Sequence, residues 1–253
     1  MSTIFDNLPS SLQTALREAF HIEIPMPVQT ASYPLIAEGR NLVMQSRTGS
    51  GKTLAYLLPL LSKLTPGESG NKLLVVAPTQ ELAVQIGHVI RDLNAKLATT
   101  YSLALIGGGA NINHQLEKLK SKPQILVGTP GRILELFDRR KINGQTIDAV
   151  VFDEIDAGIS GKTAKVVGEK FAKIAKTTQI IAVSHLAQIA CMSDGEFLIE
   201  KKEENGKTRT FIRALSAEEQ KEEIVRLLGG EQGEQAAYLH AEELLQRARE
   251  FKA

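Results

Sequence analysis

A glycine-rich turn between two apolar stretches constrains the fold of this chain more than any other feature of its sequence. Residues 41–46 have the composition of a strand, and residues 53–64 have the spacing of a helix. Backbone N–H groups at such a strand-to-helix corner can wrap a phosphate, and the helix dipole favours the anion. The residues predicted to form this phosphate loop are Ser46, Arg47, Thr48, Gly49, Ser50, Gly51, Lys52 and Thr53. Ser46 stands where the strict pattern has a glycine.

An acidic pair at the end of a later apolar strand completes the chemistry that the loop requires. We expect Lys52 to reach the β- and γ-phosphates and the Thr53 hydroxyl to bind Mg²⁺. Asp153 and Glu154 follow the apolar residues 149–152, and this end of a strand faces the ligand crevice in open α/β sheets. Asp153 would hold Mg²⁺ through water, and Glu154 would position or deprotonate the attacking water. The sequence therefore predicts a site for ATP and Mg²⁺.

A second Gly-Lys-Thr occurs at residues 161–163, and we interpret it as an ordinary helix start. Asp156 stands where a phosphate loop needs its first glycine, and no apolar strand leads into the motif with loop spacing. We therefore expect only the first of the two motifs to bind phosphate.

Strand-like and helix-like segments alternate along most of the chain. Apolar runs at residues 72–78, 102–108, 124–130 and 179–185 are separated by amphipathic stretches with helical spacing. This alternation is typical of βα units on a mostly parallel sheet with helices on both faces. The chain has 253 residues, 43% of them hydrophobic, which is enough for one large core. We therefore predict the α/β class.

The pattern changes after Ala187. Asn205-Gly206 lies between two stretches that carry charges on one face, which predicts a β-hairpin. Two helical stretches follow the hairpin. We expect a phosphate-loop domain over residues 1–200, extended by a hairpin and helices over residues 201–253.

Composition narrows the class of protein further. The formal net charge is +1, so charge alone does not indicate a nucleic-acid binder. Cys191 is the single cysteine, which excludes an internal disulfide and favours a small hydrophobe in a reducing compartment. No run of about 18 apolar residues occurs, and the start of the chain does not have the pattern of a signal peptide. We therefore expect a soluble cytoplasmic protein.

Residues 1–156 carry several motifs, in order, that resemble the DEAD-box RNA helicase family. Phe5 followed by IPMPVQ resembles the family's adenine-reading Q motif, although His21 stands where a glycine is usual. The resemblance implies that Gln29 bonds the adenine edge and that Phe5 stacks on the base. The phosphate loop resembles motif I, and the DEID sequence at 153–156 resembles motif II. Together these motifs imply a RecA-like first lobe.

Three further motifs of that family imply a cradle for the RNA backbone. PTQELA resembles motif Ia, Gly107-Gly108 resembles the GG element and TPGR resembles motif Ib. The implied contacts are Pro78, Thr79, Gln80, Gly107, Gly108, Thr129, Pro130, Gly131 and Arg132. Gln80 replaces the family's arginine, so the cradle has one charge fewer. Two alternatives stay open: Arg132 can pair with Glu135, and the glycines can form only a tight loop.

VFDEIDAGISG, VSHLAQIA, FLIEKKEENGKTRT and HAEELL follow one another in the second part of the chain. In this order, residues 151–253 resemble the carboxyl-terminal ATPase head of the DNA repair protein RecN. Ser184 lies at a suitable distance for motif III of the helicases, but the sequence there is VSHLAQIA. The RecN resemblance implies that His185 contacts the γ-phosphate and that residues 156–161 form a D-loop. The chain thus resembles two ATPase families joined at one strand.

These resemblances lead us to expect an RNA-dependent ATPase of DEAD-box type, with RNA as its partner and DNA as an alternative. We see no second lobe, and we expect slow turnover unless a partner chain completes the site. The alternatives are a nucleotide-switched interaction module of RecN type and a recombinant that binds nucleotide and does nothing more.

Overall fold

The computed structural model describes residues 3–45, 49–107, 112–156, 159, 161–193, 196–204, 207–230 and 234–252. For residues 196–204 and 207–214 the description covers the backbone. Predicted site residues Ser46, Arg47, Thr48 and Gly108 lie outside these ranges, as does the predicted hairpin turn Asn205-Gly206.

One sheet runs through the described part of the chain in the order β3-β4-β2-β5-β6-β1-β7-β8. Neighbouring strands from β3 to β7 are parallel, and only β7 and β8 pair antiparallel. The bounds are β1 (Leu42–Met44), β2 (Leu73–Val76), β3 (Leu103–Ile106), β4 (Ile125–Gly128), β5 (Ala149–Phe152), β6 (Gln179–Val183), β7 (Glu196–Glu204) and β8 (Lys207–Ala214). The mostly parallel sheet confirms the predicted α/β class.

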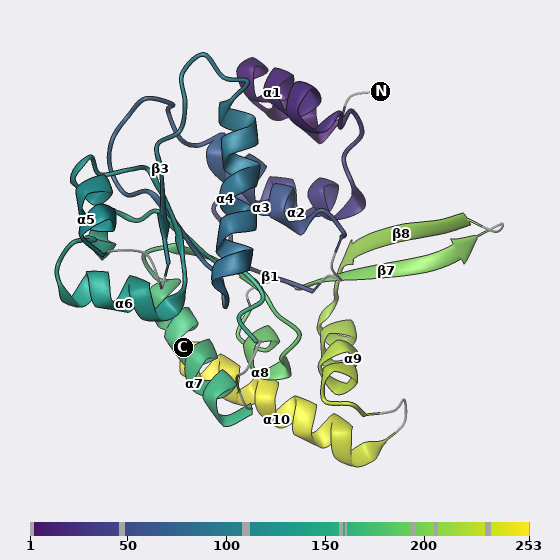
Figure 1. Ribbon diagram of the computed structural model, residues 1–253. Coiled ribbons are helices and arrows are strands. Elements are labelled where there is room, and N and C mark those ends of the chain that lie inside the picture. Colours follow the sequence, from purple (N-terminus) through teal and green to yellow (C-terminus); the bar gives the residue numbers. More distant parts are fainter. Residues whose placement is uncertain are drawn as a thin grey trace.

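Helices cover both faces of the sheet (Figure 1). The α-helices are α1 (Ser10–Phe20), α2 (Pro27–Ala37), α3 (Lys52–Leu61), α4 (Gln80–Asn94), α5 (Ile112–Lys120), α6 (Pro130–Asp138), α7 (Gly161–Ile174), α8 (Ala187–Ala190), α9 (Ala217–Leu227) and α10 (Gln235–Lys252). Two short 3₁₀ helices are η1 (Ile4–Asn7) and η2 (Gly144–Thr146). α7 begins at Gly161, which confirms that the second Gly-Lys-Thr starts an ordinary helix.

The two core layers follow from the alternation of side chains along each strand. Val75 and its neighbours on one face pack with α1 to α4 in the first core cluster. Leu74 and Val76 point the other way and pack with residues of α5 to α8 in the second cluster. Strands that are buried on both faces have continuous apolar sequences, and the sequence LLVV of β2 is an example.

The position of β6 matters most for the site. β6 lies between β5 and β1, so the strand after the acidic pair is next to the strand that leads into the phosphate loop. Residues that follow β1, β5 and β6 therefore meet at one edge of the sheet.

The carboxyl-terminal part continues the same sheet. β7 pairs with β1, and the predicted hairpin of β7 and β8 projects from the body of the molecule (Figure 1). α9 and α10 share a separate apolar cluster with α8, which includes Ile224, Ala241 and Leu245. The boundary expected between residues 200 and 201 falls inside β7, and the division into two parts stays a prediction. No helix in the described ranges combines the length and apolarity needed to cross a membrane.

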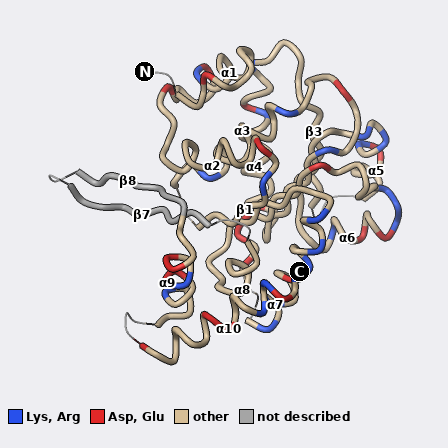
Figure 2. Tube along the Cα trace, turned by 180° about the vertical axis from the view of Figure 1, so that it is seen from behind, with Lys and Arg blue, Asp and Glu red and all other residues tan. Residues whose placement is uncertain are grey.

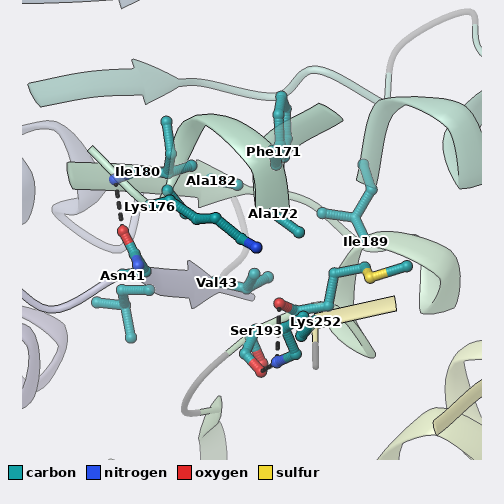
Figure 3. A pocket seen from close by; sticks show the side chains of 13 residues that line it. Asn41, Val43, Phe171, Ala172, Lys176, Ile180, Ala182, Ile189, Ser193 and Lys252 are labelled. Carbon is teal, nitrogen blue, oxygen red and sulfur yellow. Dashed lines mark hydrogen bonds between the residues drawn. The ribbon is translucent and has the colours of Figure 1, made fainter. Parts of the chain in front are cut away.

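α10 ends against the second face of the sheet. Lys252 Nζ donates to the carbonyl oxygens of Ser193 at 2.9 Å and Met192 at 3.3 Å (Figure 3). A cavity of about 200 Å³ lies beside this contact, between α7, β1, β6 and the end of α10. Its walls include Asn41 and Ile180, at the start of β1 and β6, so it lies away from the edge where the predicted ATP site is.

Candidate nucleotide and nucleic-acid site

The described part of the phosphate loop needs its glycines. Gly49 and Gly51 have φ angles of 76° and 86°, in the left-handed region that favours glycine. Gly51 is the N-cap of α3, so the helix that carries Lys52 and Thr53 begins directly after it. A Cβ atom on Gly51 would lie 2.8 Å from Gln29 Nε2 and 2.7 Å from Met26 Sδ. The loop is therefore packed against the segment that resembles the Q motif.

Gln29 connects that segment to the phosphate loop. Its Nε2 donates to the Gly51 carbonyl at 3.3 Å, and its Oε1 accepts from the Met26 backbone N–H at 2.9 Å. The side chain is 1% exposed. Phe5, the other predicted adenine contact, is 6% exposed and belongs to the first core cluster. The roles of Gln29 and Phe5 toward adenine stay predictions, and Phe5 must turn out of the core to stack on a base.

Lys52 joins the phosphate loop to the acidic pair. Its Nζ lies 3.1 Å from Glu154 Oε1, and the Lys52 residue is 8% exposed. Glu154 has a φ angle of 53°, which is uncommon for a residue with a side chain and marks a sharp turn after β5. The sequence separates the two residues by about a hundred positions, and the fold brings them into contact.

Asp153 is held by a residue that sequence reasoning did not identify. The Tyr56 hydroxyl donates to Asp153 Oδ2 at 2.8 Å, and both side chains are buried. Burial raises the pKa of the Asp153 carboxyl, while the Tyr56 hydrogen bond and the charge of Lys52 lower it. Burial and then the Asp153 charge raise the pKa of Tyr56 well above its ordinary value, while a hydrogen bond with Thr53 lowers it. Tyr56 thus connects the two predicted Mg²⁺ ligands, Thr53 and Asp153.

The donor set fits a magnesium ion that is shared with a nucleotide. Asp153 Oδ1 is buried and has no hydrogen-bond partner among the described residues, so one carboxylate oxygen is left for a ligand. Carboxylate and hydroxyl oxygens suit Mg²⁺, which usually keeps several waters and binds substrate phosphates. The described residues contain no cluster of three or more His, Cys, Asp or Glu side chains that would enclose a metal alone. A site of one Asp and one Thr matches this preference.

His185 lies at the same edge of the sheet. The Ser184 backbone N–H donates to the Met44 carbonyl of β1 at 3.2 Å, which fixes the segment after β6 beside the strand of the phosphate loop. The His185 backbone N–H donates to Asp156 Oδ2 at 2.7 Å. The His185 residue is exposed, and its contact with a γ-phosphate stays a prediction.

The residues of the expected RNA cradle follow β2, β3 and β4. Thr79 is exposed and caps α4, where its hydroxyl accepts from Leu82 N–H at 3.2 Å. The Thr129 N–H donates to the Ile106 carbonyl at 3.2 Å, so the turns after β3 and β4 are joined. A Cβ on Gly107 would lie 3.0 Å from Gln80 Cδ, which shows that the Gln80 amide covers this glycine. Pro130 and Gly131 form the exposed first turn of α6.

Arg132 forms the ion pair with Glu135 that its sequence allowed, and among the described residues it also keeps one N–H donor without an acceptor. Its Nε lies 3.4 Å from Glu135 Oε2, so the predicted pair within α6 exists. Its Nη1 is buried and has no acceptor among the described residues. The guanidinium therefore retains a donor for a phosphate, and its contact with RNA stays a prediction.

A sequence model of the DEAD/DEAH box helicase family matches residues 26–193. This chain belongs to that family. The DEAD-box ATP-dependent RNA helicase CshC of Bacillus cereus is 39% identical over 173 residues, which are 68% of this chain and 44% of CshC. The probable ATP-dependent RNA helicase YfmL of Bacillus subtilis is 42% identical over 132 residues, which are 52% of this chain and 35% of YfmL. The chain thus spans less than half the length of these helicases.

Solved helicase structures confirm the fold. A DEAD box protein from Methanococcus jannaschii superposes with a TM-score of 0.61 at 33% identity, covering 70% of this chain and 48% of that one. An RNA helicase of Sulfolobus tokodaii described as hypothetical gives a TM-score of 0.60 at 28% identity, covering 72% and 53%. The RecA-like α/β fold that we expected is therefore shown.

The helicase match corrects one boundary. We expected the helicase resemblance to stop near Asp156, but the family model continues to residue 193, through α7, β6 and α8. The RecN-like resemblance of residues 151–253 is not supported by these comparisons.

Two buried side chains of this helicase lobe were not predicted from the sequence. Tyr56 reads as one more apolar residue of a buried helix, and its only signal is its place three residues after Thr53, on the same side of the helix. Gln115 reads as a surface residue of α5, yet it is 5% exposed and donates to the Gly107 carbonyl at 2.8 Å. Tyr56 contacts a residue 97 positions away, and Gln115 contacts a residue eight positions away across the connection between β3 and α5, so neither contact belongs to a motif.

Proposed function

We propose that this chain is the ATP- and RNA-binding lobe of a DEAD-box type ATPase. The observation that carries the proposal is the joined set at the sheet edge, in which Lys52 contacts Glu154 and Tyr56 contacts Asp153. Family membership and the matching relatives, whose names describe RNA helicases, support the same assignment.

The nucleotide site would work through groups that are already in place. The backbone of Gly49, Ser50 and Gly51 would bind phosphate at the start of α3, and Lys52 would move its charge from Glu154 to the phosphates. Thr53 and Asp153 would hold Mg²⁺, which when bound supplies positive charge to the β- and γ-phosphate oxygens. Once Lys52 leaves it, Glu154 is available to orient a water or accept its proton.

RNA would bind across the ends of β2, β3 and β4. Thr79, Gln80, Gly107 and Arg132 would contact phosphates and riboses, because backbone contacts position a strand without reading its bases. Three of these residues follow different strands, so a single RNA strand would lie across the sheet edge. RNA is the proposed partner, and DNA is the alternative that binding experiments would distinguish.

Turnover by this chain alone would be slow. An arginine finger supplied against the γ-phosphate contributes about 10³ to 10⁵ in rate in ATPases of this kind. We propose that a second lobe or a partner chain supplies this charge. His185 would serve as the γ-phosphate sensor within the lobe.

The proposal is tested by measuring ATP turnover with single-stranded RNA, with duplex DNA and without nucleic acid. We expect RNA to increase turnover or ATP affinity, and we expect Arg132→Ala to reduce that increase. Arg139→Ala is the matched control, because Arg139 also pairs with Glu135, at 2.7 Å, but does not belong to the proposed cradle. If RNA changes neither quantity while ATP still binds, the RNA-dependent function is wrong.

The alternative of a nucleotide-switched interaction module has one structural observation in its favour. The apolar cluster of α9 and α10 includes Ala187 and Ala190 of α8, and α8 begins two residues after His185. A nucleotide sensed at His185 would therefore act on an element that holds the carboxyl-terminal helices. Light scattering distinguishes this alternative, since a monomer with and without ATP would count against it.

A further inference from the structure

A groove lies between α4, β3 and α5, at the edge of the sheet, with a volume of about 220 Å³. We call it the α4–α5 groove. Its polar lining consists of Gln80, Arg91, Gly107, His114, Gln115 and Lys118. Gln80 and Gly107 belong to the proposed RNA cradle, so the groove continues that cradle beyond the last strand of the sheet.

Gln115 places an unused acceptor in this groove. Its residue is 5% exposed, and its Nε2 donates to the Gly107 carbonyl at 2.8 Å, which fixes the orientation of the amide. Its Oε1 is buried and receives no hydrogen bond from the described residues. A buried acceptor without a donor is unfavourable, and an N–H or O–H group of a ligand in the groove would satisfy it.

The rim of the groove is basic. Arg91, His114 and Lys118 line it, and no Asp or Glu is among its lining residues. Within the described ranges neither Arg91 nor Lys118 forms an ion pair, in contrast to Lys120, which pairs with Glu117 at 2.7 Å. Figure 2 shows Lys and Arg positions along α5 at this side of the molecule. The two unpaired cations are therefore free to bind anions.

The shape of the groove suits a nucleotide chain. Gln80 and Arg91 lie eleven residues apart on α4, which is about 16 Å along the helix and close to three full turns, so both face the groove. The floor is apolar, and α4 packs tightly on β3, because a Cβ on Gly87 would lie 2.5 Å from Leu105 Cδ2. The basic rim matches the positively charged grooves that follow the backbone of single-stranded nucleic acids in proteins.

We propose that the α4–α5 groove binds an unpaired RNA nucleotide that continues past the backbone cradle. Gln115 Oε1 accepts a hydrogen bond from the ribose 2′-hydroxyl or from a base N–H, and Arg91 and Lys118 bind the adjoining phosphates. This inference rests on the proposed RNA-binding function and extends it to a further subsite.

The test measures binding of a labelled oligouridylate in the presence of ATP and Mg²⁺, over a range of KCl concentrations. Arg91→Gln combined with Lys118→Gln should weaken binding roughly tenfold and make the slope of log affinity against log salt shallower by about 1.4, since each phosphate contact on a single strand contributes about 0.7. Lys162→Gln combined with Lys170→Gln removes the same charge from exposed positions of α7 and should leave the slope unchanged.

Gln115→Met removes the acceptor while keeping the length of the side chain and adding no charge, and it also removes the Nε2 donor to the Gly107 carbonyl. We expect weaker RNA binding with an unchanged salt slope. DNA of deoxyuridine keeps the base N–H and lacks the 2′-hydroxyl, so equal effects of Gln115→Met on both strands identify the base as donor, and a loss only with RNA identifies the ribose.

The outcomes separate this inference from the proposed function. If the parent binds RNA and the double variant of Arg91 and Lys118 binds it with the same affinity and slope, the groove inference is overturned alone. If the parent binds no RNA, the proposed function fails together with the inference. An equal effect of the α7 control pair would show a general charge effect and would also overturn the groove.

Discussion

At the scale of single residues, Gly51 carries two constraints in the described part of the phosphate loop. Its backbone is left-handed, and its missing side chain makes room for Gln29 and Met26. Gly49 is also left-handed, but nothing lies within 4 Å of the position that its Cβ would take. Substitutions at the two glycines therefore distinguish the effect of backbone strain from the effect of close packing.

We predict that Gly51→Ala weakens ATP binding far more than Gly49→Ala does. Both variants should lose about 1–2 kcal/mol of stability from the left-handed backbone. Only Gly51→Ala also pushes Gln29 away from the loop. ATP titration together with thermal unfolding measures both effects, and equal ATP affinities in the two variants would contradict a role in ATP binding for the contact between Gln29 and the loop.

Tyr56 leads to a prediction about pH. The pKa of Asp153 is raised by burial, and Tyr56 opposes that rise by stabilising the charged form. Tyr56→Phe should therefore raise the pKa of Asp153 further and cost about 1.5–3 kcal/mol of stability at neutral pH, the usual size of a hydrogen bond to a charged group.

The sign of the pH dependence follows from linkage. A carboxyl group whose pKa is raised in the folded state destabilises that state when it is charged. This loss of stability is present above the folded-state pKa and disappears as the pH falls through that pKa. The deficit of Tyr56→Phe should consequently shrink between about pH 7 and pH 4. Urea unfolding at both pH values measures it, with Asp153→Asn as the background in which the pH effect should vanish. A deficit that does not depend on pH would contradict the role of Asp153.

The turn that leads into α3 could be predicted from sequence because the spacing of its glycines and its strand-to-helix context are local. Tyr56 and Gln115 could not, because each acts on a partner that only the fold brings near. Phe5 shows a different limit: the motif suggests a stacking role, yet the described ring is part of the core.

At the scale of elements, the alternation of strands and helices could be predicted from the sequence. The hairpin was also predicted from its Asn-Gly turn and flanking strands. Its place in the sheet was not predicted, because the pairing of β7 with β1 joins segments about 150 residues apart and leaves no local pattern. Non-local strand pairing of this kind is decided by packing rather than by propensity.

The packing of α10 in the apolar cluster leads to a prediction about stability. Leu245 is 7% exposed in that cluster, whereas Leu239 on the same helix is 62% exposed. Leu245→Ala should lower the free energy of unfolding by about 2–4 kcal/mol, and Leu239→Ala should change it little. Urea unfolding followed by circular dichroism measures both. Equal stability of the two variants would show that α10 is not packed on the domain.

At the scale of the whole molecule, the chain is an α/β lobe of helicase type whose sheet edge gathers the residues of the proposed nucleotide site. Composition and motif order were sufficient to predict that architecture, since each βα unit has its own pattern. The extent of the helicase match could not be predicted. The sequence after Asp156 resembles RecN and suggested a different continuation, whereas the helicase family model matches up to residue 193.

In the proposed site, Lys52 lies next to Glu154 and Asp153 and binds ATP together with Mg²⁺. The most direct measurement is a calorimetric titration of ATP and Mg²⁺ into the parent, Lys52→Ala and Lys162→Ala. Lys162 is the matched control, because it also lies in a Gly-Lys-Thr at a helix start but is exposed on α7. We expect Lys52→Ala to lose at least tenfold in affinity, about 1.4 kcal/mol or more, and Lys162→Ala to bind like the parent. Parent-like binding by Lys52→Ala would contradict the proposed site.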